Sequence, residues 1–266
     1  MSIIRVAEYS AIILDLDGTL LNSDKQISDR NFRAILDCHH YGMKIIFATA
    51  RPPRAVRSFL QEELIKLGSF IYYNGAYVLC EHTGIHYHEP IHAALTAEVI
   101  DFCLRENPDL DLSIEVQDEW MCIKESDYSA LMKVSRNPMV KPLEELKKLE
   151  ATKILFSGKI NELSLRQKFD NELNIVVTDN GELVQISSAK ASKEQAALLI
   201  CEGMKIPLEQ TIVFGDDHND IGLFKMCGWP VAMGNAIKEL KGLSKEVTDT
   251  NDNDGVAIVL EKMMRQ

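Results

Sequence analysis

The chain has 266 residues, of which 46% are hydrophobic and 26% are charged, a composition typical of an ordinary globular protein. Its 40 acidic residues outnumber 29 Lys and Arg, giving a net charge of −11. This charge argues against general nucleic-acid binding, which needs a basic stripe. Apolar runs stop short of the roughly 18–20 residues of a membrane span, so we expect no membrane partner. The six cysteines are scattered without a C-x-x-C pair, which favours reduced, mostly buried thiols in a cytoplasmic protein.

The first third of the chain alternates between apolar runs and helical patterns. Residues 11–15 (AIILD), 44–48 (KIIFA) and 70–73 (FIYY) predict strands that are buried on both faces. Residues 28–41 and 53–67 carry the apolar spacing of helices, and a glycine follows each of them. This β-α-β-α-β order is the signature of a doubly wound, Rossmann-like parallel sheet.

After residue 76 the pattern changes to short strands mixed with helices, which indicates an α+β module. Strands are predicted near 110–116, 120–124, 153–157, 175–178 and 183–187, and an Asp-Asn-Gly turn joins the last two. Helices are predicted near 96–106, 127–135 and 161–173.

The α/β pattern returns with a helix that begins after Ser192 and that we expect Gly203 to end. A strand at 211–215, a helix to Cys227 and a final helix from Gly255 follow. The fold class is therefore α/β, with one parallel-sheet core interrupted by an inserted α+β cap domain. The predicted boundaries are 1–82 for the first part of the core, 83–187 for the cap and 188–266 for the second part of the core.

Two carboxylates follow the first predicted strand, on Asp15 and Asp17. Ligands of an open α/β sheet sit beyond the carboxyl ends of its strands, so both acids are expected at a ligand crevice. Gly18 allows a tight turn there. Carboxylates this close do not both ionise freely unless a cation neutralises them, and Mg²⁺ commonly bridges carboxylates to a phosphate. The alternative for this motif alone is a solvated acidic turn.

Polar residues also follow two other predicted strands. Thr49, Ala50 and Arg51 offer a hydroxyl, backbone N–H groups and a guanidinium that suit phosphate oxygens or, for Arg51, a carboxylate. Late in the chain, Asp216 and Asp220 are placed to approach the same metal from a neighbouring strand end. The acid between them, at position 217, has a simpler alternative as a helix cap.

Taken together, these motifs resemble the haloacid dehalogenase superfamily of phosphohydrolases. The resemblance is closest to its Cof-type sugar-phosphatase branch, which inserts a large C2-type cap between the second and third motifs. It spans nearly the whole chain and rests on IILDLDGTLLNSDKQIS, IIFATARPP, YYNGA, IVFGDDHNDIGLF and VAMGNA.

The resemblance implies a role for each site residue. Asp15 would be the nucleophile and Asp17 the general acid/base, which requires a raised pKa when the alcohol leaves. The implied Mg²⁺ ligands are Asp15, the Asp17 backbone carbonyl and Asp216, with Asp220 in support. The implied phosphate-holding groups are Thr49, the Ala50 N–H, Lys193 and Asn219, with Arg51 as possible support.

Four features depart from the family pattern. Ala50 replaces the usual glycine of the second motif, where its methyl group narrows the space. Lys190 is a rival of Lys193 for the phosphate-binding lysine, and Glu194 places an acid beside it. Asp217 stands where a small residue is commoner. Apart from these departures, the histidines at 86, 88 and 92 match no metal motif and are expected to be surface or strand residues.

The sequence therefore predicts a Mg²⁺-dependent phosphatase of a small phosphomonoester, acting through an aspartyl-phosphate, in which the cap closes over the site and residues within 83–187 choose the substrate. Sugar phosphates, pyridoxal phosphate and flavin mononucleotide are all compatible. A phosphomutase of the same superfamily and, less favoured, a non-catalytic phosphometabolite-binding module are the alternatives. The sequence leaves the oligomeric state open.

Overall fold

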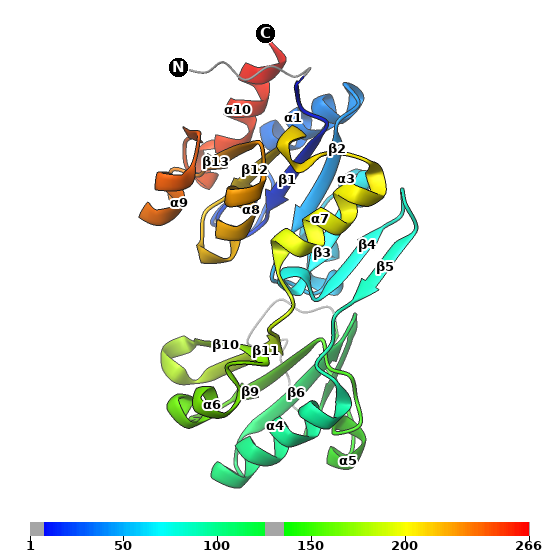
Figure 1. Ribbon diagram of the computed structural model, residues 1–266, viewed down its shortest axis with the longest axis vertical. Coiled ribbons are helices and arrows are strands. Elements are labelled where there is room, and N and C mark those ends of the chain that lie inside the picture. Colours follow the sequence, from blue (N-terminus) through cyan, green and yellow to red (C-terminus); the bar gives the residue numbers. More distant parts are fainter. Residues whose placement is uncertain (1–7, 126–135, 266) are drawn as a thin grey trace. The chain divides into compact units, whose positions relative to one another are not determined.

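The computed structural model describes residues 8–125 and 136–265, which form two units, each with its own sheet (Figure 1). Apart from the short segment Pro52–Ala55, which is grouped with the second unit, the chain passes between the units at Tyr87–His88 and at Ala191–Ser192. These crossings lie a few residues after the predicted boundaries. At the first of them, strand β5 (Ile85–His88) extends the sheet of the first unit. The first unit comprises the chain up to Arg51, then Val56–Tyr87 and the chain from Ser192, and the second comprises Pro52–Ala55 and His88–Ala191.

An eight-stranded sheet with the order β14-β13-β12-β1-β2-β3-β4-β5 forms the first unit. Its central strand, β1, pairs in parallel with β2 on one side and with β12 on the other. The parallel pairing continues through β3, β13 and β14, whereas β4 runs antiparallel to β3. The strands are β1 (Ala11–Asp15), β2 (Lys44–Ala48), β3 (Gly68–Tyr72), β4 (Tyr77–Cys80), β12 (Thr211–Gly215), β13 (Trp229–Ala232) and β14 (Glu246–Val247).

The chain leaves the centre of this sheet in two directions, from β1 to β2 and from β12 to β13. Right-handed crossovers then place the connecting helices on opposite faces. Helix α1 (Asp29–His40) packs against α10 (Gly255–Met264), while α7 (Lys193–Met204), α8 (Ile221–Met226) and α9 (Lys238–Leu243) contact one another in turn (Figure 1). The predicted doubly wound core is confirmed. Its switch point lies between the carboxyl ends of β1 and β12, where such sheets bind ligands.

Two helix predictions in this unit are wrong in detail. The segment 53–67 is not one helix but α2 (Pro53–Phe59) and α3 (Glu62–Leu67), because Gln61 between them has extended backbone angles, φ −65° and ψ 149°. Helix α7 does not stop at Gly203 but at Lys205, whose φ is 58°. A side chain on Gly203 would lie 2.7 Å from Ile85 Cδ1, so this glycine serves close packing rather than helix termination.

A six-stranded sheet with the order β10-β11-β9-β6-β7-β8 forms the second unit, and all its pairs except β7–β8 are antiparallel. Three helices cover one face and share its apolar core, which includes Ile100, Phe156 and Phe169. The helix predicted at 127–135 lies outside the described residues. The strands are β6 (Asp111–Val116), β7 (Glu119–Cys122), β8 (Met139–Val140), β9 (Lys153–Ser157), β10 (Leu173–Thr178) and β11 (Leu183–Ser188), and the helices are α4 (Ala93–Glu106), α5 (Leu143–Leu146) and α6 (Glu162–Phe169).

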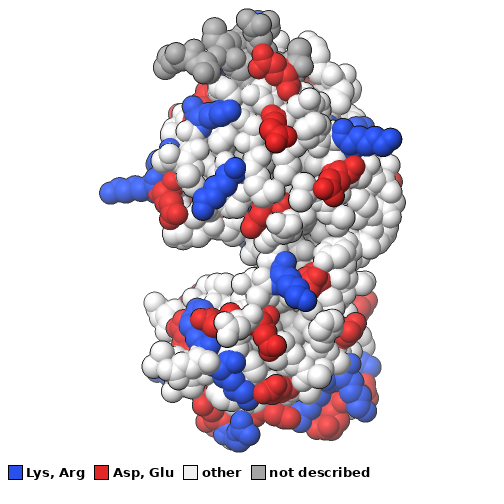
Figure 2. Space-filling model, in the orientation of Figure 1, with Lys and Arg blue, Asp and Glu red and all other residues white. Residues whose placement is uncertain are grey.

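Surface and cysteine chemistry agree with a globular protein. All six cysteines are buried free thiols, as predicted. Among the described helices, none is long and apolar enough to cross a membrane. On the face that Figure 2 draws, basic and acidic side chains of the described residues are interspersed.

Candidate active site

Asp15 lies at the carboxyl end of β1, whose five residues AIILD are all buried. The parallel register pairs Asp15 with Ala48, the last residue of β2. Thr49 therefore follows at the same edge of the sheet, and it is 1% exposed. Its hydroxyl accepts a hydrogen bond from the Arg51 N–H at 3.1 Å. The apolar runs thus bury β1 and β2, and each strand presents one polar group at its carboxyl end: Asp15 after β1 and Thr49 after β2.

Lys193, the first residue of α7, is completely buried beside Asp15. Its Nζ donates to Asp15 Oδ1 at 2.6 Å and to Asp220 Oδ1 at 2.7 Å. The hydroxyl of Ser192 caps the helix by accepting from the Gln195 N–H, which fixes where the lysine enters. The rival residue, Lys190, is exposed, so Lys193 is the lysine that contacts the predicted nucleophile.

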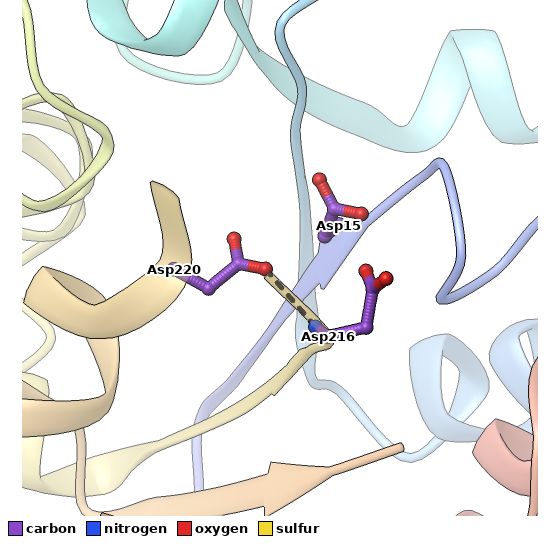
Figure 3. Close-up of side chains that lie close together, drawn as sticks. All are labelled: Asp15, Asp216 and Asp220. Atoms are coloured by element: carbon purple, nitrogen blue, oxygen red, sulfur yellow. Dashed lines mark hydrogen bonds between the residues drawn. The ribbon is translucent and has the colours of Figure 1, made fainter. Parts of the chain in front are cut away.

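The turn after β12 supplies the other two acids. Asp220 accepts hydrogen bonds from the backbone N–H groups of Asp216 and Asp217 at 3.1 and 3.4 Å, which folds its carboxylate back toward the strand. Asp217 caps the following turn through the His218 N–H at 2.8 Å, as its alternative interpretation proposed. Oxygens of Asp15, Asp216 and Asp220 all lie within 4.8 Å of one another, and the carboxylates face a common space (Figure 3).

The electrostatics of this cluster follow from burial and crowding. Burial raises the pKa of Asp15 well above its usual value, Lys193 opposes this, and the carboxylates of Asp220 and Asp216 add to it. Burial also raises the pKa of Asp216 to about 6, although the hydrogen bond from Thr19 acts to lower it. The pKa of Lys193 is raised, because Asp15 and Asp220 outweigh the effect of its burial. One buried ammonium therefore faces three crowded carboxylates.

Gly18 fits the predicted tight turn closely. Its φ is +79°, in the left-handed region, and a β-carbon there would overlap the Asp216 carboxylate. The next residue, Thr19, is buried and donates from Oγ1 to Asp216 Oδ1 at 3.0 Å. The motif that follows β1 therefore positions the acid that follows β12.

Replacing Gly18 by alanine tests this packing. We expect Gly18→Ala to lower the free energy of unfolding by about 1–2 kcal/mol through backbone strain and to displace Asp216 as well. A rise in Tm that added Mg²⁺ causes in the wild type should then be lost in this variant. Gly42→Ala is the matched control, because Gly42 has a φ of +95° but a β-carbon there meets nothing within 4 Å. Equal Mg²⁺ shifts in both variants would contradict the role given to Gly18.

Asp17 is held differently from what the sequence analysis expected. Arg51 donates to it from Nε at 2.5 Å and from Nη2 at 2.7 Å, and Lys25 Nζ donates at 2.8 Å. Burial by itself would raise the pKa of Asp17, but these hydrogen bonds and charges outweigh it and lower the pKa. The acid role expected of Asp17 requires a raised pKa when the alcohol leaves, whereas the pKa is lowered in this arrangement. Arg51 pairs with a carboxylate, one of the two roles foreseen for it.

Two further departures from the family pattern, Glu194 and Ala50, lie in the first unit. The Glu194 carboxylate lies over Gly222 of α8, where an added β-carbon would overlap it. This close approach explains the glycine and shows where the unexpected acid points. Ala50 is half-buried after Thr49. In the second unit, His88 Nε2 bonds to the Thr152 hydroxyl at 2.7 Å.

Sequence reasoning missed two residues that contact the predicted site. Lys25 was not singled out, although it lies eight residues after Asp17 in the same predicted loop. Asn74 was quoted only within YYNGA, yet its side-chain oxygen accepts from the amide of Asn219 at 3.0 Å. The signal that could have found Asn74 is the Asn-Gly pair directly after a buried strand.

The chain belongs to the haloacid dehalogenase-like hydrolases, because the model of this family matches residues 12–260. It is 27% identical to phosphatase YwpJ of Bacillus subtilis, over 95% of this chain and 99% of that protein. It is 26% identical to the 5-amino-6-(5-phospho-D-ribitylamino)uracil phosphatase YitU of the same organism, over 94% of this chain and 96% of that protein. The crystal structure of TM0651 from Thermotoga maritima matches with a TM-score of 0.85 and 27% identity, over 96% of this chain and 97% of that one. The predicted family and enzyme class, a phosphoric monoester hydrolase, are confirmed.

Proposed function

We propose that the protein is a Mg²⁺-dependent phosphatase that hydrolyses a small phosphomonoester through an aspartyl-phosphate on Asp15. The observation that carries this proposal is the meeting of three distant segments at one strand end. Asp15, Lys193 and Asp220 are joined by hydrogen bonds of 2.6 and 2.7 Å, and Asp216 lies beside them. A buried nucleophile, a buried cation and further acids suit attack on an anionic phosphate.

The donor set fits a divalent metal. Three carboxylates that share a space within 4.8 Å are hard oxygen ligands. The pKa values of Asp15 and Asp216 are raised although Lys193 is close, which supports the need for a further cation. Asp15, Asp216 and the backbone carbonyl of Asp17 would hold Mg²⁺, with Asp220 in support. When bound, Mg²⁺ supplies positive charge that lowers the repulsion between the Asp15 carboxylate and the phosphate.

The chain's own residues would carry two displacements at phosphorus. In the first, an Asp15 carboxylate oxygen bonds to phosphorus, the ester P–O bond breaks, and Asp17 gives its proton to the leaving alkoxide. In the second, water attacks phosphorus, Asp17 takes a proton from it, and the bond to Asp15 breaks to release inorganic phosphate. Thr49, the Ala50 N–H, Lys193 and Asn219 would hold the phosphate oxygens throughout.

The acid step requires a change at Asp17. Its carboxylate pairs with Arg51 and Lys25, which favour the ionised form. Asp17 would therefore have to leave these partners, or lose their charge by competition with the substrate phosphate, before it donates a proton. Closure of the second unit as a cap (residues 83–187 in the sequence prediction) is the event we propose for this release, and residues of the cap would choose the substrate.

A phosphate-release assay tests the proposed function. Purified protein with Mg²⁺ should hydrolyse p-nitrophenyl phosphate, and EDTA should abolish the activity until Mg²⁺ is restored. A panel of sugar phosphates and related metabolites should follow, including 5-amino-6-(5-phospho-D-ribitylamino)uracil, the compound in the name of the relative YitU. Absence of turnover over the whole panel would overturn the proposal. Isomerised sugar phosphate without inorganic phosphate would favour the mutase instead.

Mg²⁺ binding should depend on pH through Asp216. At pH 7.5 a group with a pKa of about 6 is ionised, whereas at pH 5 the cation must displace its proton. We expect Mg²⁺ affinity to be about tenfold weaker at pH 5 than at pH 7.5 from this group alone. The Mg²⁺-induced rise in Tm, measured across this range, should shrink accordingly. Asp216→Asn is the control, since it should remove most of the Mg²⁺-induced rise in Tm at both pH values. An equal rise at pH 5 and pH 7.5 in the wild type would contradict the assignment of Asp216.

A further inference from the structure

The turn after β3 has an unusual backbone. Tyr73, Asn74 and Gly75 have φ values of 51°, 54° and 106°, so two residues with side chains adopt the left-handed conformation in succession. Such conformations are costly for residues other than glycine and persist only where the surroundings hold them. The turn lies at the same sheet edge as Asp15, because β3 is parallel to β2 and β2 to β1.

Three contacts hold this turn against the segments that carry the proposed phosphate-binding groups. The Asn74 N–H donates to the carbonyl of Thr49 at 2.9 Å, and the Tyr73 N–H donates to that of Arg51 at 3.3 Å. Gly75 lies against the backbone of Ser192, and a β-carbon there would overlap the Ser192 carbonyl oxygen. The turn therefore contacts the segment of Thr49 and the residue that precedes the buried lysine.

The side chain of Asn74 reaches the third segment. Its Oδ1 accepts a hydrogen bond from Asn219 Nδ2 at 3.0 Å, although 145 positions separate the two residues in the chain. Asn219 is exposed, so without a partner its amide would sample several rotamers. A side-chain amide has two N–H donors, and this bond uses one. The second remains for an acceptor such as a phosphate oxygen.

We propose that Asn74 is a positioning residue for the phosphate: it orients the Asn219 amide, while its backbone fixes the strand end that carries Thr49. This inference rests on the proposed function, since the acceptor is the phosphate of the substrate. The order that Asn74 imposes lowers the entropy lost when phosphate binds. Its effect should fall on binding rather than on the chemical step, because ordering the Asn219 amide contributes equally to the substrate complex and to the transition state.

The chain contains a matched control for this turn. Asp179, Asn180 and Gly181 have φ values of 52°, 56° and 90°, nearly those of the 73–75 turn, but they join β10 and β11 in the second unit. A β-carbon on Gly181 would meet nothing within 4 Å. Asn74→Gly and Asn180→Gly both keep a residue that tolerates positive φ and both remove one amide. Backbone effects of the two changes should therefore be similar.

The experiment compares wild type, Asn74→Gly and Asn180→Gly with p-nitrophenyl phosphate and Mg²⁺, and measures inhibition by inorganic phosphate. For Asn74→Gly we expect KM and the inhibition constant for phosphate to rise roughly three- to tenfold, with kcat changed by less than twofold. Asn180→Gly should match wild type in all three. When Asn219 is already replaced by alanine, Asn74→Gly should cause no further rise in KM. If Asn74 were merely structural, its effect would add to that of Asn219→Ala.

Each other outcome has a definite meaning. Wild-type protein without activity would overturn the proposed function. Active wild type with an unchanged Asn74→Gly variant would overturn this inference alone. The inference would also be overturned if the effects of Asn74→Gly and Asn219→Ala on KM added in full in the double variant. A fall in kcat with an unchanged KM in Asn74→Gly would overturn it too.

Discussion

Asp15→Asn should reduce kcat for p-nitrophenyl phosphate by at least about 10⁴-fold, because an amide cannot take the place of the attacking carboxylate. The same change should leave the fold intact. Burial and neighbouring acids raise the pKa of Asp15, which means that folding without metal disfavours its ionised form, and asparagine is a neutral group of the same shape. Thermal unfolding in EDTA should therefore give a Tm equal to or above that of wild type.

The control is Asp24→Asn, which changes an exposed acid in the loop that follows the same motif and should leave activity unchanged. A second measurement identifies the covalent step. Wild type that is quenched in acid during turnover of a ³²P-labelled substrate should carry label on the peptide with Asp15, and Asp15→Asn should carry none. Residual activity of Asp15→Asn within tenfold of wild type would remove Asp15 from the mechanism.

The sequence predicted those parts of the site that depend on position along a strand. Asp15, Thr49 and Asp216 each follow a buried apolar run, and parallel strands bring their carboxyl ends to one edge. The fold class followed from the same runs and from the glycines and caps between them. These signals are local, so a single chain reveals them without knowledge of its tertiary contacts.

Contacts between distant segments were beyond such reasoning. Gly203 looks like a helix stop, yet it lies inside α7, where Ile85 packs against it and leaves no room for a side chain. The pKa of Asp17 depends on Arg51 and Lys25, whose side-chain directions no local pattern fixes. Asn74 gains its partner from a turn 145 positions away. Apart from Lys25, which lies in the same loop as Asp17, each deciding group comes from a segment whose proximity could be known only after the sheet order was known.

Lys193→Met should lower both stability and activity strongly. Methionine matches the length of the stem but leaves Asp15 and Asp220 without their shared cation in a buried place. Breaking a buried ion pair typically costs about 3–5 kcal/mol, and loss of a charged phosphate-binding donor costs roughly 10²–10³-fold in kcat. The exposed Lys190→Met, three residues earlier, is the matched control and should behave like wild type.

The loss of stability in Lys193→Met should itself depend on pH, and the buried carboxyl groups determine whether the loss grows or shrinks as pH rises. Lys193 opposes the rise in the pKa of Asp15, so without the lysine this pKa lies still further above its value in the unfolded chain. The folded state then binds more protons than the unfolded state. Stability of the variant relative to wild type must then fall as pH rises from 5 to 7.5, and urea unfolding at several pH values measures it. Saturating Mg²⁺ should restore part of the loss at pH 7.5, because it supplies positive charge to the same three carboxylates. A deficit that is constant with pH and unaffected by Mg²⁺ would mean that Lys193 contributes packing rather than charge.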